Sequence, residues 1–248
     1  VKDAIARKVD VNETYGSLRL TPLHRAVGEG NVDLLNFLYH VGANVNIPDQ
    51  QGRTPLMTAC GFGHHLHMVE VLLDCSASLT ARDKRGWTAM HYVAAYNRQE
   101  FLKALLERRD SVNGLDQAGM SPMLLAMQRG HAQMVTLLVE LGAKTQVCSK
   151  DGQTPLHFAA YSGLVGVMEC FLGKYGADIN AVDVGGQSPL HKAMHRGFVP
   201  VVEYLLSHGA NCNIQAAGTF LTPLHLACQR GMTAVVTILL QHGAHADV

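Results

Sequence analysis

The sequence predicts an all-α repeat protein in which short helix–turn–helix units stack into a solenoid. Three observations predict this fold class. A four-residue phrase that reads T-P-L-H, or a close variant of it, recurs at intervals of 33 or 34 residues. A Gly follows most copies nine residues later, and an apolar run closed by a second Gly comes next. Self-similarity at a fixed period of this length is typical of repeat architectures.

Each phrase has the composition of a helix start. Thr or Ser is a good N-cap, because its hydroxyl can accept a hydrogen bond from an orphan amide of the first turn. Pro suits the first helical position, where it has no N–H to lose. We therefore predict a first helix with a small, apolar inner face after each copy, and the copies begin at Thr21, Thr54, Thr88, Ser121, Thr154, Ser188 and Thr222.

The rest of each unit predicts a turn, a second helix and a finger. A Gly in the left-handed conformation can end the first helix, at Gly30, Gly63, Gly130, Gly163, Gly197 and Gly231. A longer apolar helix such as VDLLNFLYH follows, and polar, Gly-bearing segments such as NIPDQQGR predict β-hairpin-like fingers with a turn at the tip. One unit cannot bury its own apolar face, so the units must stack.

The period divides the chain into consecutive repeats. We predict a partial N-terminal repeat and its finger over residues 1–20, and seven repeats over residues 21–53, 54–87, 88–120, 121–153, 154–187, 188–221 and 222–248. Because the chain starts at Val1 within what reads as a helix, we expect it to be a fragment of a longer protein.

Composition excludes several classes of function. Lys plus Arg and Asp plus Glu both number 20, so no overall field attracts nucleic acid or an anionic membrane. Since no apolar run reaches the roughly 18 residues that span a bilayer, and no signal peptide is present, we expect no membrane insertion. We expect a cytoplasmic or nuclear protein that does not bind nucleic acid.

The phrase T-P-L-H-x-A-x-x-x-G with a period near 33 resembles the ankyrin repeat over essentially the whole chain. The resemblance implies a concave face, lined by the fingers and first helices, that binds a protein or peptide partner. We expect the isolated array to be monomeric. Two alternatives stay open: a cytosolic regulatory domain of a larger channel or enzyme, and an array that inhibits a transcription factor.

The sequence contains none of the common catalytic motifs. It has no phosphate-binding loop, dinucleotide fingerprint, H-E-x-x-H or nucleophile elbow. We therefore expect no enzyme, no catalytic residue and no cofactor. The cluster of His64, His65 and His67 has no Cys or acidic residue at ligand spacing, and we expect no metal site.

The other histidines and the cysteines have structural interpretations. Five histidines occupy the fourth position of the phrase, and the resemblance implies that they tie a helix start to the neighbouring finger: His24, His91, His157, His191 and His225. The six cysteines form no C-x-x-C pair, and we expect reduced, mostly buried thiols. The methionines around Met123 favour core filling over a plastic binding groove.

Some repeats depart from the pattern. The repeat at Thr88 lacks the Pro, and Asn97 and Arg109 replace its two turn glycines. Because a left-handed conformation costs more in a residue with a Cβ, we expect residues 88–113 to be a soft point. The repeats at Thr54 and Thr154 carry extra residues, and the finger before Thr222 is unusually apolar.

The resemblance implies that partner contacts come from finger tips, from the residue before each phrase and from the end of each first helix. Aromatic residues, Met and Arg are enriched at such contacts in interfaces. The predicted partner-binding set is Phe62, Lys84, Arg85, Trp87, Tyr96, Met120, Arg129 and Tyr161. The alternative is that Trp87 only packs on the next finger.

The resemblance also implies a modification. Asparagines in finger phrases such as GANVN and GADIN can be substrates of the asparaginyl hydroxylase that modifies ankyrin repeats. The candidates are Asn46, Asn113, Asn180 and Asn213, with Asn46 and Asn180 favoured.

Overall fold

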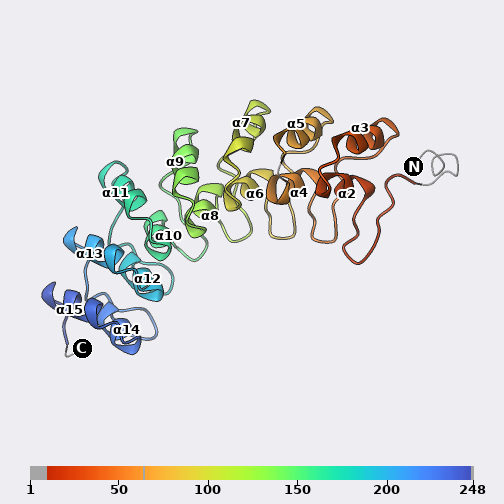
Figure 1. Cartoon of the computed structure of the whole chain (residues 1–248). Helices are drawn as coiled ribbons and strands as arrows, with labels where there is room; N and C mark the ends of the chain where they lie inside the picture. Colours follow the sequence, from red (N-terminus) through yellow and green to blue (C-terminus); the bar gives the residue numbers. More distant parts are fainter. Residues whose placement is uncertain (1–9, 64, 247–248) are drawn as a thin grey trace. The chain divides into compact units, whose positions relative to one another are not determined.

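The computed structural model describes residues 10–63 and 65–246, and these residues contain fourteen α-helices (Figure 1). The all-α repeat architecture is confirmed. Each stretch from one Thr or Ser phrase to the next holds one pair of helices, joined to the following pair by a finger. The helix expected at the start of the chain lies outside the described residues.

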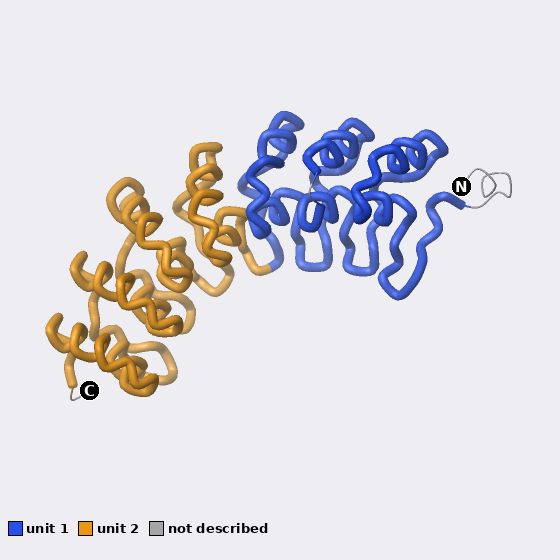
Figure 2. Tube along the Cα trace, viewed as in Figure 1, with its two compact units in different colours: residues 1–117 blue, residues 118–248 orange. Residues whose placement is uncertain are grey.

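The chain forms two compact units, residues 1–117 and residues 118–248 (Figure 2). In the first unit, α2 (Pro22–Gly28), α4 (Pro55–Phe62) and α6 (Ala89–Ala95) are the first helices of their pairs. The second helices are α3 (Val32–His40), α5 (Leu66–Asp74) and α7 (Gln99–Glu107). First helices contact first helices and second helices contact second helices, so the unit has two helix rows.

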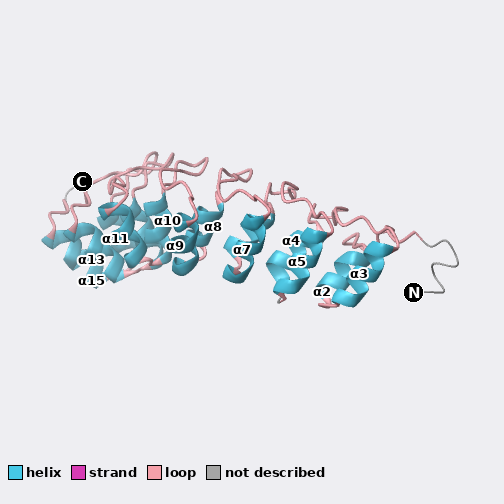
Figure 3. Cartoon of the chain, turned by 90° about the horizontal axis from the view of Figure 1, so that it is seen from above, coloured by secondary structure: helices cyan, strands magenta, loops and turns pink. Residues whose placement is uncertain are grey.

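The second unit repeats this arrangement with four pairs. Its first helices are α8 (Pro122–Gln128), α10 (Pro155–Ser162), α12 (Pro189–Arg196) and α14 (Pro223–Gln229). Its second helices are α9 (Ala132–Glu140), α11 (Val165–Gly173), α13 (Val199–Ser207) and α15 (Thr233–Gln241). In each unit the fingers project along one edge of the helix rows (Figure 3). We call the fingers and first helices together the finger face.

The helix starts follow the predicted chemistry. The hydroxyl of Thr21 lies 2.9 Å from Nδ1 of His24, and Nε2 of His24 lies 3.0 Å from the carbonyl oxygen of Arg53 in the next finger. Since a carbonyl can only accept, Nε2 carries the proton and Nδ1 accepts. Burial lowers the pKa of His24, which keeps the ring neutral. His157 and His191 make the same bridge to the carbonyls of Gln187 and Leu221, so the predicted role is confirmed for these three histidines.

The turns after the first helices show one exception to the prediction. Gly30 has a left-handed φ of 69°, as expected, but Gly63 has a φ of −74° and an extended conformation. The prediction for Gly63 is wrong, because the extra residue in this repeat lengthens the link to α5. Asn97 and Arg109 adopt left-handed φ values of 56° and 64° without glycine's freedom. The sequence analysis missed Ser76, which ends α5 with a φ of 62°.

The fingers are turns, and each is bonded to the next through the backbone. Within one finger, the amide of Asp49 donates to the carbonyl of Arg53 over 2.8 Å. Between fingers, the amide of Lys84 donates to the carbonyl of Gln51 over 2.9 Å, and the amide of Gln117 donates to the carbonyl of Arg85 over 3.0 Å. The second unit repeats this link in all its finger pairs. The finger edge of each unit is therefore held in a fixed register.

Burial follows the helix rows. All seven residues of α6 are buried, and alanines such as Ala59 and Ala94 let the first helices approach closely. Met123, Met127 and Met134 are fully buried, which confirms that they fill the core. The expectation of reduced thiols holds for all six cysteines, and the expectation of burial holds for Cys60, Cys75 and Cys212. It is wrong for three others that occupy outward positions of helices or fingers and are exposed as free thiols: Cys148, Cys170 and Cys228.

Candidate functional site

The first unit carries an aromatic cluster on its finger face. Phe62 ends α4, while Tyr92 and Tyr96 lie one turn apart on α6. The ring centroids of Phe62 and Tyr96 are 5.2 Å apart in an edge-to-face arrangement, and the rings of Tyr92 and Tyr96 stack with centroids 6.2 Å apart. Phe62 is 46% exposed and Tyr96 is 38% exposed. Two aromatic side chains are therefore fixed next to each other at the surface, which is an arrangement suited to binding.

Trp87 packs beneath this cluster and is not part of its exposed surface. Only 5% of Trp87 is exposed, and its ring meets that of Tyr92 edge to face at 5.3 Å. Its indole Nε1–H donates to Oδ2 of Asp116 in the next finger over 2.9 Å. The expectation that Trp87 contacts a partner is corrected by this burial. The alternative interpretation, in which Trp87 packs on the next finger, describes its contacts.

Lys84 and Arg85, the two cations expected at the edge of the site, differ in how firmly neighbouring groups hold them. Lys84 is exposed at a finger tip. The guanidinium of Arg85 lies 3.7 Å from the centroid of the Trp87 ring, and its Nε lies 3.4 Å from Oδ2 of Asp83. Arg85 is thus a partly covered cation that lies over an aromatic ring at the distance of a cation–π contact.

Asp83 organises this part of the site. Its Oδ1 accepts hydrogen bonds from the backbone amides of Arg85 and Trp87, each over 2.8 Å, and its Oδ2 accepts from the hydroxyl of Tyr92 over 2.8 Å. Burial and the hydrogen bond to this carboxylate raise the pKa of Tyr92, so Tyr92 stays a neutral donor. The carboxylate therefore fixes the finger tip and the ring beneath Tyr96.

Sequence reasoning missed three supporting residues, which are Asp83, Tyr92 and Arg53. The guanidinium of Arg53 lies 5.4 Å from the Phe62 centroid and is paired with the buried carboxylate of Asp49 over 2.6 Å. A signal was available for Tyr92, because it precedes Tyr96 by four residues and so shares its helix face. None was available for Asp83, whose bonds depend on the finger conformation.

The other predicted contact residues lie in the second unit. Met120 is 6% exposed, and this burial corrects the expectation that it offers a contact surface. Arg129 is exposed at the end of α8, and Tyr161 is half-buried on α10. The guanidinium of Arg196 lies 5.0 Å from the Tyr161 ring centroid. This pair adds an aromatic–arginine contact on the finger face of the second unit.

Candidate hydroxylation asparagines bridge neighbouring repeats through their side chains. Oδ1 of Asn46 accepts from the amide of Ser78 over 2.7 Å, and Oδ1 of Asn180 accepts from the amide of Asn211 over 2.8 Å. Oδ1 of Asn213 likewise accepts a hydrogen bond from the backbone amide of His245 over 2.9 Å. Asn113 also lies in a finger, where its backbone amide donates a hydrogen bond to Oγ of Ser111 over 3.2 Å. A modifying enzyme would reach these side chains only after the local hydrogen bonds open.

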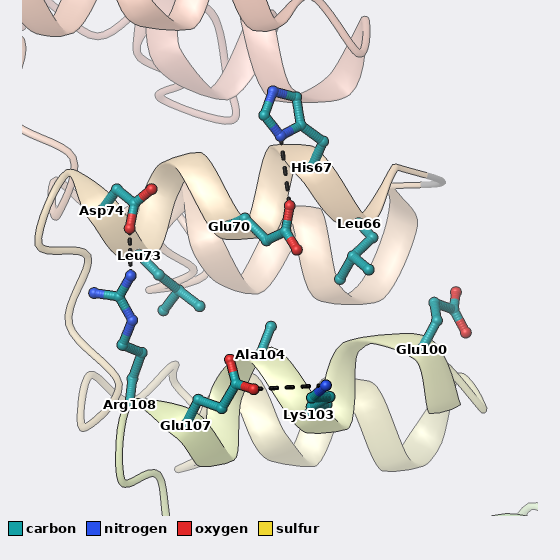
Figure 4. Close-up of a pocket in the computed structure, with 10 residues that line it drawn as sticks. All are labelled: Leu66, His67, Glu70, Leu73, Asp74, Glu100, Lys103, Ala104, Glu107 and Arg108. Atoms are coloured by element: carbon teal, nitrogen blue, oxygen red, sulfur yellow. Dashed lines mark hydrogen bonds and ion pairs between the residues drawn. The ribbon is translucent and has the colours of Figure 1, made fainter.

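A groove of about 440 Å³ lies away from the finger face, between the second helices α5 and α7 (Figure 4). Charged side chains line it and pair with one another: His67 with Glu70, Lys103 with Glu107, and Arg108 with Asp74. These pairs are solvent-exposed, and such pairs contribute at most about 1 kcal/mol each. We interpret the groove as a solvent-exposed gap between two neighbouring helices.

Residues 10–63 and 65–246 contain no group of three His, Cys, Asp or Glu side chains that could hold a metal ion. The cluster of His64, His65 and His67, where no metal site is expected, is only partly described, because His64 lies outside these ranges. No described helix has the length and apolar composition needed to cross a bilayer.

Comparison with known proteins agrees with the repeat geometry. A family model for ankyrin repeats (three copies) matches residues 23–116, 108–183 and 175–248. The B-cell lymphoma 3 protein homolog of Mus musculus is 32% identical over 178 residues, covering 70% of this chain and 39% of that protein. Palmitoyltransferase AKR1 of Lachancea kluyveri is 29% identical over 184 residues, covering 71% of this chain and 25% of that protein. Rabankyrin-5 of Mus musculus is 32% identical over 146 residues, covering 58% of this chain and 12% of that protein. The chain thus spans well under half of each relative, and its repeats show that it belongs to the ankyrin-repeat family.

Proposed function

We propose that this chain is a non-catalytic module that binds a protein or peptide partner through its finger face. Ankyrin repeats generally mediate protein–protein interaction. The observation that carries the finer proposal is the exposed pair Phe62 and Tyr96, held at 5.2 Å over a buried and hydrogen-bonded support. A surface that is ordered before binding loses little conformational entropy when the partner docks.

The contact set follows from the burial of the candidates. Phe62 and Tyr96 are the anchors, and Lys84 and Arg85 form the charged edge beside them. Trp87 is a positioning residue that holds Arg85 and Tyr92 in place. In the second unit, Arg129 and Tyr161 are the contact residues of the same face. Met120 is removed from the set because it is buried.

The module's setting is proposed more broadly. We place it in the cytoplasm or nucleus, as a monomer with no nucleic-acid ligand and no cofactor. Palmitoyltransferase AKR1 is named as an enzyme, and the match covers 25% of it. The alternative of a regulatory domain attached to a larger enzyme therefore stays open beside that of a transcription-factor inhibitor. In either setting the finger face is the part that binds.

Affinity purification followed by mass spectrometry, and then binding measurements with the purified partner, test the proposal. Phe62→Ala with Tyr96→Ala should weaken binding about thirtyfold or more, since desolvated anchors cost about 2 kcal/mol or more on truncation. The matched control is Tyr39→Ala, which removes an aromatic side chain that is 41% exposed on the second helix α3 of the same unit. If Tyr39→Ala lost binding while the double variant bound fully, the binding site would lie on the second-helix row, and the proposal would be wrong.

A further inference from the structure

Charge is segregated between the two helix rows of the second unit. The first helices and the residues that end them contain Arg129, Lys192, Arg196 and Arg230, and no Asp or Glu. The second helices of the same unit and the residues that end them contain Glu140, Glu169 and Glu203, and one cation, Lys174 at the end of α11. Zero net charge over the whole chain hides this separation. The first-helix row of this unit therefore carries a local positive potential.

Three of these cations are exposed and occupy equivalent positions. Arg129, Arg196 and Arg230 each follow or end a first helix, and Ser162 occupies the same position in the repeat between the first two. No ion pair joins these three arginines to a carboxylate among residues 118–246. Lys192 differs, because it is paired over 2.7 Å with the buried carboxylate of Asp183. The available positive charge thus comes from the arginine row.

Two of the arginines are oriented by uncharged groups. Arg196 lies over the ring of Tyr161, with 5.0 Å between its guanidinium carbon and the ring centroid. Arg230 donates to the carbonyl of Met194 over 3.2 Å, to the carbonyl of His195, and to Nδ1 of His195 over 3.0 Å. Carbonyl and imidazole acceptors position a guanidinium without neutralising it. The positive charge of these two arginines is therefore available to bind an anionic ligand.

A hollow lies beside this row, next to the Tyr161 ring over which Arg196 lies. It measures about 340 Å³ and is lined by Gln128, Gln153, Phe158, Tyr161, Lys192 and His195. Aromatic faces and side-chain amides line it, and its one lysine is already paired with Asp183. This lining suits a neutral side chain better than a phosphate. It favours a peptide over a nucleic acid as the occupant.

The spacing of the row selects a conformation for the peptide. Successive first helices are in contact from α8 to α14, and packed helices lie about 8–10 Å apart. A polyproline II peptide has about 3 residues per turn and rises about 3.1 Å per residue, so every third side chain returns to the same face after about 9 Å. Acidic residues at every third position would therefore meet successive repeats of the row.

We propose that the first-helix row of the second unit binds an acidic linear peptide in the polyproline II conformation. Asp or Glu side chains at every third position pair with Arg230, Arg196 and Arg129, and a neutral side chain between two of them enters the hollow beside Tyr161. This inference rests on the proposed binding role but uses residues other than the Phe62 and Tyr96 pair. It therefore can fail while the function proposed above holds.

Fluorescence anisotropy with the whole chain tests this inference. The probe is a labelled proline-rich peptide with Glu at every third residue, and its comparator has the same composition with the Glu residues grouped at one end. The spaced peptide should bind about tenfold more tightly than the grouped one, and salt should weaken it. Arg196→Ala and Arg230→Ala should each weaken the spaced peptide about tenfold.

Matched controls decide between this site and general charge attraction. Lys174→Ala removes an exposed cation beside the second helix α11 and should leave binding unchanged. Phe62→Ala with Tyr96→Ala in the first unit should also leave it unchanged. Equal binding of spaced and grouped peptides, tighter binding of a single-stranded oligonucleotide, or an equal loss in Lys174→Ala would overturn the inference. Circular dichroism melting of each variant separates a lost contact from a lost fold.

Discussion

Replacing Trp87 distinguishes a supporting residue from a contact residue. Its indole is buried, donates to Asp116 over 2.9 Å and lies 3.7 Å beneath the guanidinium of Arg85. Trp87→Ala removes the packing and the hydrogen bond, so it should lower the free energy of unfolding by about 3–5 kcal/mol. Trp87→Phe keeps an aromatic ring but loses the bond to a carboxylate, which should cost about 1.5–3 kcal/mol. Urea unfolding followed by far-ultraviolet circular dichroism measures both changes, since Trp87 is the chain's only Trp and its fluorescence would be lost.

A double-mutant cycle provides the control. If the Trp87–Asp116 hydrogen bond carries the loss in Trp87→Phe, the double variant with Asp116→Ala should lose less than the sum of the two single losses, because both changes remove this one interaction. Additive losses would show that the bond is not the cause. The reasoning would be refuted if Trp87→Ala changed stability by less than about 0.5 kcal/mol, the range of ordinary surface substitutions, while it abolished partner binding. Trp87 would then act as a direct contact.

The remaining predictions concern pH, local opening and modification. Burial raises the pKa of Asp110 from 3.8 to about 6, so its proton favours the folded state. As pH rises from about 4 through 6, the wild type should lose up to about 3 kcal/mol of unfolding free energy relative to Asp110→Asn. A difference that stays constant with pH in urea unfolding would exclude this role. Hydrogen exchange should show faster opening of residues 88–113 than of the repeat at Thr154, because Asn97 and Arg109 are held at positive φ without glycine. Stronger protection of 88–113 would contradict this. Mass spectrometry with full sequence coverage should find hydroxylation at Asn46 or Asn180 before it appears at Asn113 or Asn213. If all four asparagines are unmodified, the hydroxylation proposal is wrong.

The fold could be predicted from the sequence because local chemistry repeats in register. N-cap Thr or Ser, Pro at the first helical position and a histidine that reaches the next finger all act within one repeat or between neighbours. Their outcome does not depend on distant parts of the chain. The failures also have local causes. Gly63 is extended because an extra residue follows it, and Ser76 takes a left-handed turn at a position where most repeats have glycine.

The candidate site was predicted less well, because exposure depends on contacts between fingers. Phe62 and Tyr96 could be placed at the surface from their repeat positions. Trp87 occupies an equally variable position, yet the carboxylate of Asp116 in the next finger draws its indole inward. The separation of charge between helix rows was visible in the sequence once the rows were known. It was hidden by a net charge of zero.

Site-specific photo-crosslinking tests most directly whether the finger face binds the partner. A benzophenone amino acid would replace Gln117, which is exposed in a finger, or Tyr39, which is 41% exposed on the second helix α3 of the same unit. Both variants would be irradiated with the partner identified by affinity purification. The account predicts a crosslinked product from position 117 and none from position 39. A product from position 39 alone would contradict it, because the partner would then lie on the second-helix row.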